Sequence, residues 1–270
     1  KFNDYSLRLG KTRVRNLNGG LEQWFETVFV QYLHEESNFS RVEYIEPSRG
    51  EPVFGVTADE LFVQSGNTFV IGLGWDWPEI RGTGFQTTGH RERAWIFTSN
   101  EIWGSEADFS QVYLSSRINR LLGDRWKFLF RAEAGYSNAK TREFVIDSAL
   151  GPLDLSVTDL PYFYRFKAGG SQSVRGYDFE KLDNNGLGSN NILAASAEVE
   201  YLFHENWSVA AFADIGNAFN DWRKPELKFG SGVGLRWYSI IGALRLDFAK
   251  GWDLAGEPWQ IHLTIGTPLL

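Results

Sequence analysis

Strict alternation of apolar and polar residues is the clearest pattern in the chain. From Trp126 to Tyr136 the even positions are Trp, Phe, Phe, Ala, Ala and Tyr, whereas the odd positions are mostly Lys, Arg, Glu and Gly. A period of two places successive side chains on opposite faces of a β-strand. The segment therefore predicts a strand with one apolar face, aromatic at both ends, and one hydrophilic face.

The same alternation recurs along the chain and is more regular in its C-terminal third than near its N-terminus. It predicts about twelve strands of roughly ten residues, the length at which a tilted strand crosses a bilayer. We expect these strands near 5–14, 25–34, 53–63, 68–77, 93–103, 109–118, 126–136, 192–203, 207–218, 229–237, 244–248 and 261–265.

The predicted connections alternate between short and long. Gly123-Asp124, His204 to Asn206 and Ile240 to Gly242 are tight turns, whereas Glu79–His90 and residues 138–190 are long. Tight turns at one end and long loops at the other are typical of outer-membrane β-barrels. An even number of strands would also place both ends of the chain on the same side of the membrane.

A soluble β-sandwich or a lipocalin-like barrel is the alternative fold. Either one would bury Arg131 and Glu133 or expose the whole row of Trp126, Phe128 and Phe130 to water. Such a row exceeds the apolar patch of a few hundred Å² that soluble proteins tolerate. We therefore predict an all-β fold, an antiparallel transmembrane β-barrel, with the three rings facing lipid and the two charged residues facing water.

Composition agrees with a barrel and excludes several function classes. The chain is 43% hydrophobic and 16% aromatic, yet its mean hydropathy is only -0.30, because lipid-facing and lumen-facing residues alternate. A net charge of -7 argues against nucleic-acid binding. The absence of Cys excludes disulfides and thiolate metal sites. Because the chain opens at Lys1 and not at Met, we expect it to be part of a longer protein.

No enzyme motif is present, so we expect no catalytic, metal-binding or cofactor-binding residues. The run Gly230-x-Gly232-x-Gly234 is not followed by a helical pattern, which argues against a phosphate-binding loop. We interpret these glycines as lying on the inward face of a tightly curved strand. The four histidines are scattered and form no metal-ligand spacing: His34, His90, His204 and His262.

The connection after Tyr136 is about fifty residues long, several times the usual loop length. Residues 162–177 within it combine aromatic side chains, an arginine and the glycines Gly169, Gly170 and Gly176. Glycine permits backbone conformations that other residues resist, and the aromatic rings can pack against the wall. We expect this segment to fold back into the barrel lumen.

The run Gly169–Tyr177, with the sequence GGSQSVRGY, resembles the VRGF/Y motif in loop 6 of the outer-membrane assembly-factor superfamily. That superfamily includes BamA, TamA and the two-partner secretion transporters. The segments Val199–Tyr201, Phe212–Gly216 and Gly230–Trp237 are similar to the family's strands after loop 6. The closing residues Ile265–Leu269 are most similar to the TamA branch. The resemblance is specific from about Arg125 to the end of the chain.

The resemblance implies a site inside the barrel. In the family, the loop 6 arginine pairs with acidic residues of the strands that follow, which here implies Arg175 with Asp214 and Glu200. Alternation independently places both acids on the inward face. The pair could equally serve only to anchor a plug. The site residues implied are the motif Val174, Arg175, Gly176 and Tyr177, the loop glycines Gly169 and Gly170, and the partners Asp214 and Glu200.

Lumen charges of both signs surround these positions. Alternation predicts that acids and bases of neighbouring strands lie on the same inward face. The acids are Glu133, Glu198, Glu200 and Asp247. Such a mixture predicts a solvated interior with ion pairs across strands. The bases are Arg131, Arg236 and Arg245.

The chain departs from the family pattern in size. Barrels of the family have sixteen strands, eleven before loop 6 and five after, whereas we expect about seven before and five after. Residues 1–270 are predicted to form one barrel domain with loop 6 at about 137–190, while a periplasmic POTRA or passenger domain is absent from this chain. Two interpretations stay open: four N-terminal strands lie outside the given sequence, or the chain is a natural twelve-stranded relative. If 5–14 is the true first strand, the family's lateral gate would lie between it and the last strand, 259–265.

We therefore predict an integral barrel in the outer membrane of a Gram-negative-type bacterium that helps to insert or translocate other proteins. It would need no cofactor. Its partners would be the lipid bilayer, client outer-membrane or secreted proteins, and a periplasmic partner bound through the missing N-terminal domain. Two other functions stay open: a translocator barrel for a fused passenger, such as a patatin-like lipase, and a plugged passive pore.

Overall fold

The computed structural model describes residues 4–17, 22–38, 44–45, 52–53, 63–148, 151–182, 187–239, 242–253 and 259–266. Within these ranges eleven strands form one antiparallel sheet in the order β1-β2-β5-β6-β7-β8-β11-β12-β13-β14-β15. The strands are β1 (Tyr5–Leu17), β2 (Glu22–Asn38), β5 (Val63–Arg81), β6 (Thr88–Ser99), β7 (Phe109–Leu122), β8 (Trp126–Ser137), β11 (Asn191–His204), β12 (Trp207–Phe219), β13 (Lys228–Ser239), β14 (Gly242–Gly251) and β15 (Trp259–Ile265).

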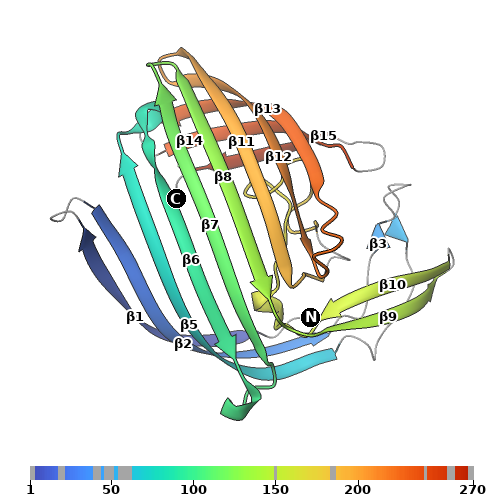
Figure 1. Ribbon diagram of the computed structural model, residues 1–270. Coiled ribbons are helices and arrows are strands. Elements are labelled where there is room, and N and C mark those ends of the chain that lie inside the picture. The colour runs from blue at the N-terminus through green and yellow to red at the C-terminus, as the bar shows by residue number, and fades with distance from the viewer. Residues whose placement is uncertain are drawn as a thin grey trace.

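In the described residues, the connections contain two hairpins and three 3-10 turns. The hairpins are β3 (Tyr44–Ile45) with β4 (Pro52–Val53), and β9 (Thr141–Ser148) with β10 (Gly151–Thr158). The 3-10 turns are η2 (Gly84–Gln86), η3 (Glu101–Trp103) and η4 (Tyr162–Tyr164). The β9–β10 hairpin belongs to loop 6 and projects from the long-loop end of the sheet (Figure 1).

The sheet curls on itself, so that β13–β15 lie across the interior from β6–β8 (Figure 1). Tight connections follow β7, β11 and β13 at one end, here called the turn end, while loop 6 lies at the opposite, loop end. Because neighbouring strands are antiparallel, Tyr5 lies at the loop end and Ile265 at the turn end. The described strands therefore do not place both ends of the chain on one side, as an even count would have done.

The strand expected at 53–63 is not a separate strand of the sheet. β2 pairs directly with β5, in register from Phe25 with Asp76 to Asn38 with Val63, which leaves no space for a strand between them. Val53 belongs to β4 and Val63 begins β5, while residues 54–62 lie outside the described residues. The described sheet therefore has eleven strands where about twelve were expected, six before loop 6 and five after it.

Two further boundaries differ from the alternation pattern. Glu79 and His90 pair with each other in the β5–β6 ladder, so the expected long connection shrinks to residues 82–87. Charged outward residues interrupt the apolar alternation at this end of the two strands, so the pattern does not reveal them. The His90 imidazole, for example, lies 3.2 Å from the Glu79 carboxylate. At the other end β6 stops at Ser99, because the Asn100 side chain accepts a hydrogen bond from the Ile102 backbone N–H and begins η3.

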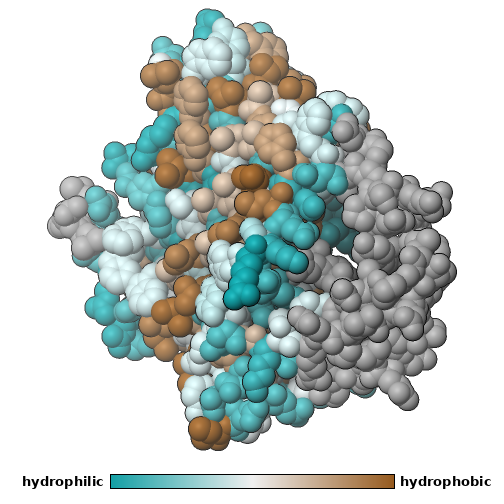
Figure 2. Space-filling model, turned by 45° about the vertical axis from the view of Figure 1, so that its right-hand side comes forward, coloured by the Kyte–Doolittle hydropathy of each residue, from teal (hydrophilic) through white to brown (hydrophobic). Residues whose placement is uncertain are grey.

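The two faces of the wall are as the alternation predicts. Along β8, Trp126, Phe130 and Tyr136 point outward and are 45–50% exposed, whereas Lys127 and Leu129 point inward and are buried. Figure 2 shows apolar side chains running from the top of the visible wall toward its lower left. A soluble sandwich or lipocalin-like barrel would bury this apolar face. The exposed rings therefore favour a lipid-facing wall over either soluble fold.

The interior is filled by side chains and by loop 6. One apolar cluster packs Tyr164 and Leu160 of loop 6 against Leu33, Val70 and Phe109 of the wall. A second packs Val174 and Tyr177 against Ile192 and Ala218. None of the helical segments among the described residues has the length and hydrophobicity of a membrane span.

Candidate functional site

Loop 6 turns back into the interior after the β9–β10 hairpin. Phe166 bridges to Ser189 and Ala168 to Leu182, so the loop forms a narrow antiparallel ribbon that carries the motif at its tip. Val174 is fully buried and Tyr177 is 2% exposed. Burial also raises the pKa of the Tyr164 phenol, at the base of the ribbon, to about 12.

Glycine is required at the turn that presents the motif. Gly170 has φ of 88°, and its N–H donates to the carbonyls of Val174 and Tyr177, both at 3.1 Å. Gly176 has φ of 89°, and a Cβ there would lie 2.5 Å from the Gly251 backbone nitrogen. Gly169 likewise has positive φ, 100°. These residues allow the chain to reverse tightly against β14.

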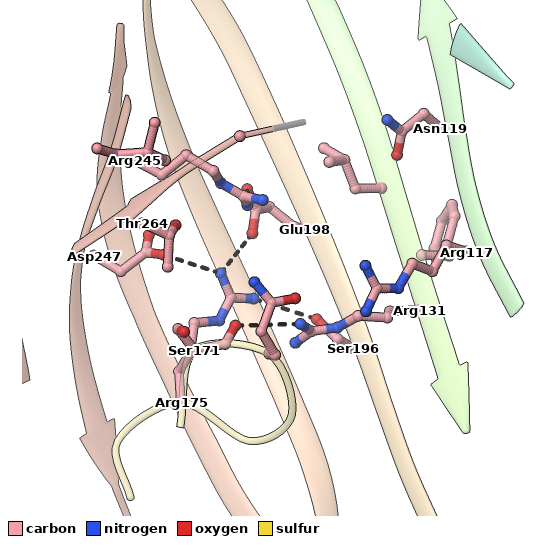
Figure 3. A pocket seen from close by; sticks show the side chains of 15 residues that line it. Arg117, Asn119, Arg131, Ser171, Arg175, Ser196, Glu198, Arg245, Asp247 and Thr264 are labelled. Carbon is pink, nitrogen blue, oxygen red and sulfur yellow. Dashed lines mark hydrogen bonds and ion pairs between the residues drawn. The ribbon is translucent and has the colours of Figure 1, made fainter. Parts of the chain in front are cut away.

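Arg175 points from the tip of the loop toward the acidic side chains of Glu198 and Asp247 (Figure 3). Its guanidinium donates in bidentate fashion to Asp214, with Nε–Oδ2 of 2.7 Å and Nη2–Oδ1 of 2.9 Å. It also donates to Glu198 Oε2 at 2.6 Å and lies 3.4 Å from Asp247. The Arg175 backbone N–H donates to Asp214 as well, at 3.0 Å. Burial disfavours the charge, but these carboxylates together raise the pKa of Arg175.

The structure brings Arg175 to Asp214 but not to Glu200. Glu198 takes the place expected for Glu200, because both face inward on β11 but Glu200 lies two residues, about 6.6 Å, nearer the turn end. Loop 6 reaches only to the depth of Glu198. Glu200 instead accepts hydrogen bonds from Tyr238 and Ser208.

The acids around Arg175 are shared with the wall. Glu198 also accepts from Arg236 at 2.8 Å and from Arg245 at 2.7 Å. Arg236 in turn lies 2.6 Å from Asp247. The network therefore joins β11, β12, β13 and β14 to the loop, as the mixed charges of the inward faces predict, and a buried arginine within it has several charged partners.

Arg131 and His262 also hold the loop, through contacts that the sequence patterns did not predict. Arg131 donates to the carbonyl of Ser171 at 3.2 Å (Figure 3) and to that of Ser173 at 2.8 Å. The Gly176 N–H donates to His262 Nε2 at 3.1 Å, which ties the motif to the last strand. Backbone carbonyls and a single histidine give no sequence signal, so only the fold could reveal these contacts.

The inward glycines of β13 provide space for the motif. A Cβ at Gly230 would lie 2.0 Å from the Arg175 carbonyl oxygen, and one at Gly232 would lie 2.6 Å from the Phe212 ring. The Phe212 ring itself packs under the guanidinium, 3.4 Å from Arg175 Cζ. Loop 6 therefore packs directly against the glycine run of β13.

A separate contact fills the turn end of the interior. Phe85, from the β5–β6 turn, packs edge-on against Tyr238 of β13, and the two rings flank the Lys127 ammonium at 4.5 and 4.7 Å. The interior is thus occupied from both ends, by loop 6 and by this turn. Among the described residues no group of three His, Asp or Glu side chains could hold a metal ion.

Residues 3–268 match the Omp85 superfamily domain. The chain belongs to the Omp85 superfamily. Its fold is similar to BamA from Haemophilus ducreyi lacking POTRA domains 1-3, with TM-score 0.69 and 17% identity over 98% of this chain and 54% of that one. It is also similar to CdiB from Escherichia coli, with TM-score 0.59 and 16% identity over 97% of this chain and 45% of that one.

The Omp85 assignment agrees with a wall that faces lipid and places the barrel in the outer membrane. Members of the Omp85 superfamily are non-enzymatic transport and assembly barrels that act on client proteins. The chain spans about half the length of the two structures it resembles.

Proposed function

We propose that this Omp85 barrel assists the insertion or translocation of client proteins at a lateral seam between β1 and β15, without enzymatic chemistry. The observation that carries the proposal is the pairing of the two outermost strands. Within the described residues, β1 pairs only with β2 and β15 pairs only with β14. Each therefore presents one edge of backbone donors and acceptors.

Such an edge is a strong driving force for strand addition. In hydrocarbon an unpaired N–H or C=O costs several kcal/mol, because no water is present to replace the missing partner. A client strand that pairs with the edge satisfies these groups by β-augmentation. The seam would thereby stabilise a client strand before its own barrel closes.

The apolar outward band also narrows toward the seam. On β8 it runs from Trp126 to Tyr136, about 33 Å along the strand at 3.3 Å per residue. On β15 it runs from Trp259 to Ile265, about 20 Å, and on β1 from Tyr5 to Leu9, about 13 Å. A short apolar band thins the bilayer beside it, which lowers the barrier to membrane entry.

Two finer points are part of the proposal. We propose that the chain belongs to the TamA branch, which the similarity of its C-terminal residues supports. We also propose that Val174, Arg175, Gly176 and Tyr177 act by fixing loop 6 beneath the seam through Asp214. The fused-passenger alternative makes a different prediction about the segment upstream of Lys1, where a lipase domain favours secretion and POTRA repeats alone favour assembly.

The test is an insertion assay with the chain reconstituted in phospholipid vesicles. A urea-unfolded eight-stranded barrel is added, and we expect it to fold several-fold faster than in empty vesicles. An excess of a synthetic peptide with the sequence of residues 126–136 should compete for the seam and remove the acceleration, whereas the same residues in scrambled order should not. Unchanged folding rates together with a large, steady conductance would favour the passive pore instead.

A further inference from the structure

Three cationic side chains follow one another on the lipid-facing side of β1. Arg8 points inward, since its guanidinium donates to Gln31 and lies 4.0 Å from the buried Phe29 ring. Alternation then places Lys11, Arg13 and Arg15 on the outward face, each two residues from the next. All three are exposed, and together they form a strip about 13 Å long.

The strip is poorly neutralised by the protein. Arg15 forms an ion pair with Glu26 at 3.0 Å, and Glu22 lies farther toward the turn end on β2. In the described part of the chain, the side chains of Lys11 and Arg13 have no hydrogen-bond or ion-pair partner, and the single Glu26 carboxylate, register partner of Arg13, is paired with Arg15. Other outward cations at the same end differ: Arg81 pairs with Glu79 at 2.7 Å, and Arg120 donates to the Gly89 carbonyl.

The strip begins at the membrane interface. Arg15 is the register partner of Trp24, and Trp24 stacks on Trp77 with ring centroids 5.7 Å apart. Paired outward tryptophans mark the level of the lipid headgroups. From there Arg13 and Lys11 extend toward the hydrocarbon, where an unpaired charge on the lipid face is costly. Their long side chains can reach back to the headgroups.

The turn end fixes which leaflet is involved. Outer-membrane barrels have short turns on the periplasmic side, so the strip lies in the inner leaflet, which phospholipids form. Phosphate is the group that arginine and lysine bind most readily at such an interface. We propose that Lys11, Arg13 and Arg15 form a binding strip for the phosphates of anionic phospholipids. The strip is independent of the proposed insertion function and needs no client.

The experiment measures lipid binding to the detergent-solubilised chain by native mass spectrometry. Phosphatidylglycerol, phosphatidylcholine and lipid A are titrated separately. We expect phosphatidylglycerol to bind more tightly than the other two. The triple variant Lys11→Gln, Arg13→Gln, Arg15→Gln should weaken phosphatidylglycerol binding at least about tenfold, because each basic residue near a headgroup contributes separately.

Two further variants separate the strip from general effects of charge. Lys11→Arg with Arg13→Lys and Arg15→Lys keeps all three charges and should keep the affinity. Arg81→Gln with Arg120→Gln removes two outward cations at the same end and should also keep it. Arg13→Gln alone, with a smaller expected loss, replaces the triple variant if that variant does not fold. Equal affinities of the triple variant and the unaltered chain overturn the proposal, as does tighter binding of lipid A at these residues.

Discussion

Arg175→Ala is expected to release loop 6 from the lumen and to destabilise the barrel by about 3–5 kcal/mol, the effect of removing one partner from a buried ion network. Among the described residues, the substitution leaves Asp214 with Ser196, at 2.6 Å, and Arg131, at 4.0 Å, as its hydroxyl and charged partners. Glu198 keeps Arg236 and Arg245, so the network is damaged mainly at β12. Urea unfolding of the reconstituted chain measures the loss, and planar-bilayer recordings should show larger conductance.

Arg175→Lys is the matched control, because it keeps the charge but cannot make the bidentate contact with Asp214. We expect an intermediate loss of stability. If Arg175→Ala leaves both the unfolding midpoint and the conductance unchanged, the ion network does not hold loop 6 in place.

Gly230→Leu should expel the motif even though every charged partner of Arg175 is kept. The Cβ alone would meet the Arg175 carbonyl oxygen at 2.0 Å, and this contact is with backbone, which cannot rotate away. The strand itself should survive, because leucine is tolerated in a β-ladder. The expected result is a folded barrel with a displaced loop 6.

The absence of cysteine from the chain gives this prediction a clean reporter. Val174 is fully buried, so the thiol of the Val174→Cys variant should resist a water-soluble maleimide while loop 6 stays in place. The same thiol should react rapidly when Val174→Cys is combined with Gly230→Leu. Val233→Leu, on the outward face of the same strand, is the matched control and should leave the reporter protected. Continued protection in the Gly230→Leu variant would mean that the motif has another place to lie.

Alternation predicted which face of each strand meets lipid but not the depth of a residue along its strand. It therefore placed both Glu198 and Glu200 toward the lumen and could not choose between them, because that choice depends on how far loop 6 reaches. The resemblance of residues 169–177 supplied Arg175 and Asp214, which the structure brings together. Arg131, by contrast, binds backbone carbonyls, and any sequence can supply these.

The missed boundaries also have physical causes. The ends of β5 and β6 carry charged outward residues that pair with one another, as Glu79 and His90 do, so a hydropathy pattern interprets them as loop. The Asn100 side chain ends β6 by a local hydrogen bond, although Trp103 and Ile102 continue the apolar pattern. Tertiary pairing and local capping thus override periodicity at strand ends.

The central claim is that β15 offers an unpaired backbone edge to a client strand, and hydrogen–deuterium exchange of the detergent-solubilised chain, in which water can reach that edge, tests it most directly. We predict that alternate amides of residues 259–265 exchange quickly while those of β14 are protected, and that the peptide with the sequence of residues 126–136 slows the fast set. Protection of all β15 amides before the peptide is added, or fast exchange that the peptide leaves unchanged, would contradict the account.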